Sequence, residues 1–232
     1  DIDTIISYLP KKHQTLMFSA TMPNSIRQLA HKILYKPVEI SLSISKPVES
    51  VDQKVYLIFE EQKVKVIKHI LVERKHYDSI IIFTSTKKKV SDIVSSLNRY
   101  GFPSQGISSN LDQDKREEVL MGFRSKRIRI LVATDVMSRG IDVKEINMVV
   151  NYDVPNDTED YVHRIGRTAR VNAKGEAITL VTQKEMYKLK EIEQLIEASI
   201  PKIQPPGDIG SVPKWKEIKP KSKNKRRFYK RK

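Results

Sequence analysis

The segment SIIIFTSTKKKV, residues 79–90, shows the pattern that decides the fold. Its continuous apolar run predicts a strand, Ser79–Phe83, that is buried on both faces. Thr84–Thr86 are good helix-capping residues and predict a helix that begins at Thr86 and continues to Tyr100. A fully apolar strand that leads directly into a helix is typical of a parallel sheet covered by helices on both sides.

The same alternation continues along the chain. We predict further strands at Val55–Phe59, Ser104–Ile107, Ile128–Ala133, Met148–Tyr152 and Glu176–Val181. We predict further helices at Gln62–Glu73, at Asp112–Arg124, around residues 161–170 and at Lys184–Ser199. Nearer the N-terminus we predict a buried strand at Thr15–Ala20, a helix from Pro23 to Leu34 and one more short strand at Val38–Leu42. The predicted fold class is therefore α/β, with a parallel sheet and helices on both faces.

Composition narrows the kind of protein. The chain of 232 residues is 39% hydrophobic, which supports a packed core, and it has no cysteine, which excludes disulfides and fits a cytoplasmic setting. No apolar run approaches the roughly 20 residues of a membrane span, so we predict no membrane contact. No His, Asp or Glu group has metal-ligand spacing, so we predict no metal site. A net charge of +15 favours a polyanionic partner, nucleic acid first.

The segment YVHRIGRTAR, residues 161–170, places arginines at positions 164, 167 and 170. On a continuous helix these three residues would fall within about 120° of one another. Guanidinium groups suit phosphate oxygens, so the cluster is either a clamp for polyphosphate or an ordinary solvated basic face.

Three strand ends carry polar residues, and ligands of open parallel sheets gather at the carboxyl ends of the strands. Thr84–Thr86 are followed by three lysines, which either face phosphate or lie in water. Thr134-Asp135 precede Gly140 and Asp142, which suit a ligand, although an ordinary turn with a capping Asp is an alternative. Asp153 either orients basic neighbours or merely ends its strand, and we favour the second. Because no phosphate loop of the type Gly-x-x-x-x-Gly-Lys-Ser/Thr is present, the chain suggests half of an active site.

These residues resemble a known family. His163-Arg-Ile-Gly-Arg-Thr-Ala-Arg170 resembles the His-Arg-x-Gly-Arg-x-x-Arg motif of DEAD-box ATP-dependent RNA helicases, and Ser19-Ala-Thr21 resembles their Ser-Ala-Thr motif. Further matches, in the family's order, are Ile82-Phe83 with Thr86, Gln113 with Arg116, and Thr134-Asp135 through Arg139-Gly-Ile-Asp142. The basic tail and short core are similar to bacterial RhlE-type members. Ala169, and Ser109-Asn110 before the Gln-x-x-Arg motif, depart from the usual family pattern.

The resemblance implies a RecA-like fold, with ATP and RNA bound between two such domains. It implies that Arg167 and Arg170 act as arginine fingers on the γ-phosphate, with His163 in the catalytic machinery. The remaining implied roles are nucleotide binding by Gly140 and Asp142, coupling between domains by Ser19, Thr21 and His163, and RNA backbone binding by Thr86, Gln113, Arg116 and Thr134. The Mg²⁺ ligands are expected in the first domain.

The resemblance also divides the chain. We expect a remnant of the first helicase domain at 1–42, a linker at 43–53, the second RecA-like domain at 54–200 and a disordered basic tail at 201–232. We expect a monomer whose remnant is disordered, swapped between chains or docked on another chain. We also expect no ATP hydrolysis by this chain alone, because it contains neither the phosphate loop nor an Asp-Glu-Ala-Asp stretch.

Two other functions remain open at this point. The chain could be a non-catalytic RNA-binding or protein-docking module in which the arginines form only an anion patch. It could also be part of a DNA translocase of the wider superfamily, although His163 and Ser19-Ala-Thr21 argue against that class.

Overall fold

The structure is a computed structural model that describes residues 2–10, 12–19, 22, 24–40, 51–135, 146–168 and 175–215. The chain divides into two compact units, Asp1–Ser45 and Lys46–Lys232. Each unit is described separately below.

The smaller unit contains two helices, α1 (Ile2–Ser7) and α2 (Asn24–Ile33), and α2 confirms the helix predicted after Pro23. The strand predicted at Thr15–Ala20 is wrong, because residues 15–19 have no regular structure and Phe18 is 89% exposed. Residues 38–40 of the second predicted strand are not in a strand either. An isolated strand leaves its backbone groups without hydrogen-bond partners, and the described part of this unit contains no other strand to supply them.

The larger unit is built on a seven-stranded sheet in which every described pairing is parallel. The strand order across the sheet is β3-β4-β2-β5-β6-β1-β7. The strands are β1 (Val51–Leu57), β2 (Ile80–Phe83), β3 (Ser104–Ile107), β4 (Ile130–Ala133), β5 (Met148–Asn151), β6 (Gly175–Val181) and β7 (Lys202–Ile203). The α/β fold class predicted from the sequence is confirmed.

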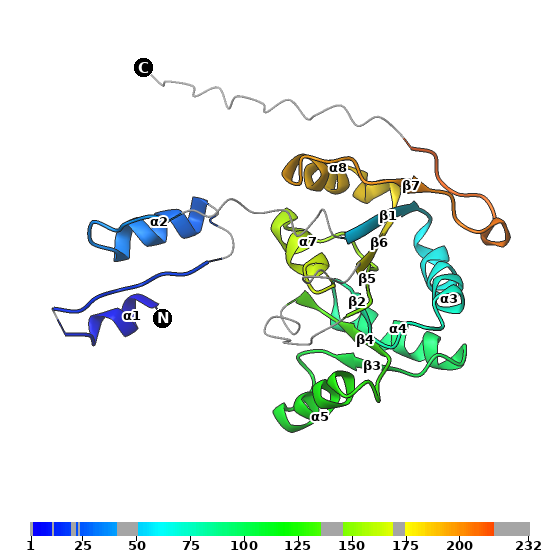
Figure 1. Cartoon of the computed structure of the whole chain (residues 1–232), viewed down its shortest axis with the longest axis horizontal. Helices are drawn as coiled ribbons and strands as arrows, with labels where there is room; N and C mark the ends of the chain where they lie inside the picture. Colours follow the sequence, from blue (N-terminus) through cyan, green and yellow to red (C-terminus); the bar gives the residue numbers. More distant parts are fainter. Residues whose placement is uncertain are drawn as a thin grey trace, which may run out of the picture. The chain divides into compact units, whose positions relative to one another are not determined.

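Helices cover both faces of this sheet (Figure 1). Side chains of α3 (Lys63–Glu73) and α4 (Lys87–Arg99) pack into the core on one face. Side chains of α5 (Gln113–Arg124), α7 (Thr158–Ile165) and α8 (Met186–Leu195) pack on the other. Strand β2 is apolar at every position because both of its faces are buried. Ile80 and Ile82 pack into the core on one face, while Ile81 and Phe83 pack into the core on the other.

The helix starts follow the predicted capping residues. Thr86 caps α4, since its hydroxyl accepts a hydrogen bond from the Lys89 N–H at 3.2 Å. Asp112 caps α5 in the same way through the Lys115 N–H at 2.9 Å. These caps satisfy backbone N–H groups that have no partner inside the helix.

Strand β1 begins at Val51, inside the range 43–53 that was predicted as a linker. Val51 is buried, and β1 pairs with β6 along its whole length. The sequence did not indicate this start, because the polar residues Asp52 and Gln53 separate Val51 from the apolar run that begins at Val55. Residues 43–50 of the predicted linker lie outside the described residues.

The prediction of disorder from residue 201 onward is wrong for residues 201–215. Strand β7 pairs with β1, and a turn of 3-10 helix, η4 (Gly207–Ile209), follows it. Gln62 Nε2 donates to the carbonyls of Ile209 at 3.2 Å and Ser211 at 2.8 Å, and the Ile209 side chain is 6% exposed. We call residues 201–215 the strap. Its few apolar residues are too widely spaced to produce a period, and the rest of the predicted tail, 216–232, lies outside the described residues.

Candidate functional site

Arg164 lies at the centre of the carboxyl edge of the sheet. Its guanidinium forms a bidentate pair with Asp135, with Nε 2.6 Å from Oδ1 and Nη2 2.8 Å from Oδ2. Nη1 also donates to Asn151 Oδ1 at 3.1 Å and to the Asp153 carbonyl at 2.8 Å. The guanidinium carbon lies 5.1 Å from the centre of the Phe83 ring, and the side chain is 3% exposed.

These contacts correct the prediction that three arginines form one cluster on a helix face. Arg164 is buried and bound to Asp135, so its guanidinium is not available to phosphate. The helix α7 ends at Ile165 with Gly166 as its C-cap, so Arg167 lies in the turn beyond the helix. Arg170 lies outside the described residues. The helical spacing of the sequence was real, but the helix ends before the second arginine.

Asp153 follows β5 and is surrounded by donors. Its Oδ2 accepts hydrogen bonds from the Thr84 hydroxyl, the Ser85 hydroxyl and the Ser85 N–H, each at 2.8 Å. Its Oδ1 lies 2.6 Å from Lys89 Nζ and 3.3 Å from Lys63 Nζ. The expectation that Asp153 merely ends its strand is therefore wrong, because its carboxylate binds two lysines and the turn that starts α4.

The ionisation of this cluster follows from these contacts. Burial alone would raise the pKa of Asp153, but the hydrogen bond from Lys89, the charge of Lys63 and the bonds from Ser85 and Thr84 lower it well below its usual range. Burial would lower the pKa of Lys89, but its bonds to Asp153 and Glu60 raise it. The carboxylate and the lysine are therefore both charged at neutral pH.

Lys63 is the most buried charged residue of this cluster, with a side chain that is 0% exposed. Its Nζ lies 2.9 Å from Glu60 Oε2 and 3.5 Å from Glu185 Oε2, and 4.9 Å from the centre of the Tyr152 ring. The charge of Lys63 is thus balanced by three carboxylates, which is the condition under which a buried ammonium group is tolerated.

The four residues assigned to RNA binding all follow the carboxyl ends of parallel strands. Thr86 follows β2 and caps α4, and Thr134 follows β4 directly. Gln113 and Arg116 lie in the first turn of α5 after β3, and Gln113 Nε2 donates to Glu117 Oε1 at 2.7 Å. Because the carboxyl ends of parallel strands meet at one edge of a sheet, the structure brings these four residues to the same edge as Arg164.

The residues assigned to ATP and to coupling are only partly described. His163 Nδ1 lies 3.9 Å from Asp160 Oδ1, whereas its buried Nε2 has no hydrogen-bond partner among the described residues. Arg167 is partly buried in the turn after α7. Ser19 belongs to the smaller unit. The predicted residues Thr21, Gly140, Asp142 and Arg170 lie outside the described residues.

A second charged network lies at the amino edge of the sheet. Glu176, on β6, binds Arg74 through Nε at 2.9 Å and Nη2 at 2.7 Å, and binds Lys54 Nζ at 3.0 Å. Its side chain is 6% exposed, and although burial would raise the pKa of Glu176, the bonds from Arg74 and Lys54 lower it. Sequence reasoning missed both networks, since each joins residues that are far apart in the chain.

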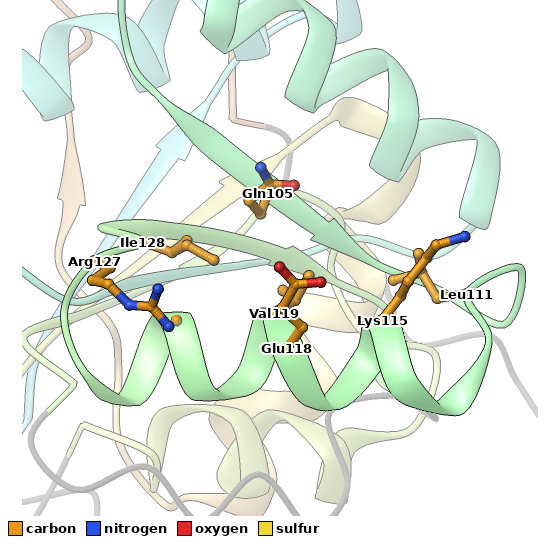
Figure 2. Close-up of a pocket in the computed structure, with 8 residues that line it drawn as sticks. Gln105, Leu111, Lys115, Glu118, Val119, Arg127 and Ile128 are labelled. Atoms are coloured by element: carbon orange, nitrogen blue, oxygen red, sulfur yellow. The ribbon is translucent and has the colours of Figure 1, made fainter.

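A cavity of about 350 Å³ lies between α5 and the edge strand β3. Figure 2 shows the side chains that line it. Apolar and charged side chains line it together, namely Gln105, Leu111, Lys115, Glu118, Val119, Gly122, Arg127 and Ile128. None of the predicted site residues is among these lining residues. Within the described residues no group of His, Cys, Asp and Glu could hold a metal ion, and no helix is long and apolar enough to cross a membrane.

Comparisons with known proteins define the class. The family model of the helicase conserved C-terminal domain matches residues 62–172. The DEAD-box ATP-dependent RNA helicase CshA of Geobacillus kaustophilus is 38% identical over 206 residues, which cover 89% of this chain and 44% of that protein. The chain thus spans a little under half the length of this relative.

Two solved structures of DEAD-box proteins are similar to this chain. S. cerevisiae Dbp5 bound to RNA and ADP BeF3 is similar with a TM-score of 0.79 at 30% identity, over 87% of this chain and 55% of that chain. The separately solved C-terminal domain of the DEAD-box protein Dbp5 is similar with a TM-score of 0.61 at 30% identity, over 68% of this chain and 92% of that chain.

The parallel sheet with helices on both faces is a RecA-like helicase domain of the C-terminal type. The chain belongs to the DEAD-box family of RNA helicases. The finer prediction of an RhlE-type member stays a prediction.

Proposed function

We propose that this chain supplies the second-domain half of an ATP-dependent RNA helicase that couples ATP hydrolysis to local unwinding of RNA duplexes. The observation that carries the proposal is the pair between Arg164 and Asp135. It ties the segment that contains His163 and Arg167 to the strand end that contains Thr134. Two described residues with proposed ATP and coupling roles, Arg167 and His163, therefore belong to a segment that is bound to the strand end carrying Thr134.

The RNA half of the proposal rests on Thr86, Gln113, Arg116 and Thr134. These residues follow three neighbouring β-strands, β2, β3 and β4, at the carboxyl edge of the sheet. We propose that they contact the backbone of one RNA strand. Hydroxyl, amide and guanidinium groups bind phosphate and sugar oxygens without reading bases. We therefore expect binding with little sequence preference and a steep dependence on salt.

The ATP half of the proposal rests on Arg167 and Arg170, with Gly140 and Asp142 at the nucleotide. Arginine fingers stabilise the charge that develops on a transferred phosphoryl group, and they act on a nucleotide that another domain holds. ATP and its Mg²⁺ would be held by the phosphate loop and acidic residues of the first helicase domain. His163, whose Nε2 has no hydrogen-bond partner among the described residues, is the proposed coupling residue of this domain, and Ser19 and Thr21 are the proposed coupling residues of the first-domain segment.

The test is ATPase activity with and without RNA, first for this chain alone and then for the protein that also contains the first helicase domain. We expect hydrolysis only in the second case, stimulated by RNA. Arg167→Ala should lower kcat by about 10³-fold or more, as loss of an arginine finger does. The exposed Arg124, on the far end of α5 from Gln113, offers the matched control Arg124→Ala, which should leave kcat unchanged.

The competing function is a non-catalytic RNA-binding module. If the longer protein binds RNA but Arg167→Ala changes only RNA affinity and no RNA-stimulated hydrolysis is ever detected, the arginines form an anion patch and the helicase proposal is wrong.

A further inference from the structure

Asp153 connects two parts of the carboxyl edge that the sequence places far apart. Its carboxylate accepts three hydrogen bonds from Thr84 and Ser85, the two residues before Thr86. Its main-chain carbonyl accepts a hydrogen bond from Arg164, which binds Asp135 beside Thr134. Asp153 therefore contacts the segment that carries Thr86 directly and the segment that carries Thr134 through Arg164.

We propose that Asp153 is a positioning residue for RNA, which fixes Thr86 and Thr134 without touching RNA itself. The inference rests on the proposed RNA surface and adds to it a residue that none of the family motifs quoted above contains. Asp153 is 4% exposed, and protein donors occupy both oxygens of its carboxylate, so it acts through its neighbours.

The contacts around Thr86 form a closed ring. The Thr86 hydroxyl accepts from the Lys89 N–H at 3.2 Å, and the Lys89 ammonium returns to Asp153 Oδ1 at 2.6 Å. Ser85, next to Thr86, donates both its N–H and its hydroxyl to Asp153 Oδ2. A ring of this kind holds the turn in one geometry before RNA arrives, which lowers the entropy lost on binding.

The same ring distinguishes Lys89 from the other two lysines that follow Thr86. Lys89 is drawn inward by Asp153 and by Glu60, whose Oε1 lies 2.8 Å from Lys89 Nζ. Lys88 and Lys87 stay exposed, and Lys87 Nζ donates to Asn110 Oδ1 at 3.1 Å. Lys89 therefore has a structural role. Only Lys87 and Lys88 remain candidates for contact with phosphate.

The perturbation that tests the proposal is Asp153→Asn. It removes one negative charge and gives the side chain an NH₂ group, which must face either the donors of Thr84 and Ser85 or the ammonium groups of the two lysines. The variant should still fold, because Lys63 keeps Glu60 at 2.9 Å and Glu185 at 3.5 Å. By charge alone, a more basic protein should bind RNA more tightly, whereas loss of positioning should weaken binding. The two effects therefore have opposite signs.

The control is Glu176→Gln. Glu176 matches Asp153 in burial and in having two cationic partners, and the substitution makes the same change in net charge. Glu176 lies at the amino edge of the sheet, away from the proposed RNA surface. The control should lose stability but not RNA affinity, so it separates a structural effect from a positioning effect.

The measurement is NMR titration of the full chain with a short single-stranded oligouridine, read at the backbone amides of Ser85, Thr86 and Lys87. These local signals report binding at this turn even if other basic segments also bind RNA. We expect the dissociation constant at these amides to rise about five- to tenfold in Asp153→Asn and to stay within about twofold in Glu176→Gln.

A second variant guards against misfolding of the first. The hydroxyl of Thr84 is buried, so Thr84 cannot touch RNA, and Thr84→Val removes only its hydrogen bond to Asp153. Thr84→Val should weaken binding at the same amides, and Thr84→Ser, which keeps the hydroxyl, should restore it.

The outcomes separate the inference from the function on which it rests. If the wild-type amides do not respond to RNA and Thr86→Ala changes nothing, the proposed RNA surface is wrong. If Thr86→Ala weakens binding while folded Asp153→Asn and Thr84→Val bind as tightly as wild type or more tightly, the surface stands and the positioning role of Asp153 is refuted.

Discussion

Replacing Arg164 with lysine tests how much the geometry of its guanidinium contributes to stability. The substitution keeps the positive charge but replaces a planar fork with a point charge. Arg164 makes four hydrogen bonds of 2.6–3.1 Å, to both oxygens of Asp135, to Asn151 Oδ1 and to the Asp153 carbonyl. A lysine ammonium carries its three donors on a single nitrogen, so from one position we expect it to reach about two of these four acceptors.

The expected loss follows from this count. Two lost hydrogen bonds, at about 1 kcal/mol each, with some strain in placing the ammonium, give a loss of about 2–3 kcal/mol in the free energy of unfolding. Arg164→Ala should cost about 3–5 kcal/mol, because it removes the cation that is paired with the half-buried Asp135. Arg124→Lys, at an exposed position with the same change of side chain, should cost less than about 0.5 kcal/mol.

Urea unfolding followed by tryptophan fluorescence measures this difference. The chain has one tryptophan, Trp215, and it packs against the core cluster of α7 and α8 in the larger unit. If Arg164→Lys unfolds within about 0.5 kcal/mol of wild type, the fork geometry contributes nothing to stability and the reasoning from hydrogen-bond count is refuted. If Arg164→Lys costs as much as Arg164→Ala, the charge that lysine retains has no value at this site.

Three further predictions concern stability. The lowered pKa values of Asp153 and Glu176 contribute stability that is present above their unfolded pKa values, about 4, and is lost as the pH falls further; acid unfolding of Asp153→Asn should therefore be less steep. Gly175→Ala should destabilise by about 1–3 kcal/mol, since the new Cβ would lie 2.5 Å from the Thr168 carbonyl oxygen, whereas Gly207→Ala meets nothing within 4 Å; thermal unfolding compares the two, and equal Tm values would contradict the geometry. Ile209→Ala should cost about 2 kcal/mol in the same assay, and a wild-type Tm would show that the strap adds no stability.

The parts of the fold that could be predicted from the sequence are those with dense local patterns. Strand β2 was found because four consecutive apolar residues face two cores at once, and the start of α5 because Asp112 is a strong cap. The strap was missed because it is held by backbone pairing to β1 and by the Gln62 side chain, neither of which leaves a periodic signal. Local pattern therefore predicts elements but not the backbone contacts that hold an irregular segment.

The site shows the same division in its chemistry. The spacing singled out residues 163–170, but it treated Arg164 and Arg167 as equivalent. They differ because α7 ends at Ile165, which leaves Arg164 facing inward toward Asp135 and Arg167 in the turn beyond the helix. The sequence of this segment does not indicate which arginine is buried, because the carboxylate that binds Arg164 belongs to Asp135, 29 residues away in the sequence. The family resemblance implied roles for the motif residues only. The fold shows in addition that Asp153, outside those motifs, accepts hydrogen bonds from Ser85 and from Arg164. A residue that positions others is defined by what surrounds it, so it becomes visible only when those surroundings are assembled.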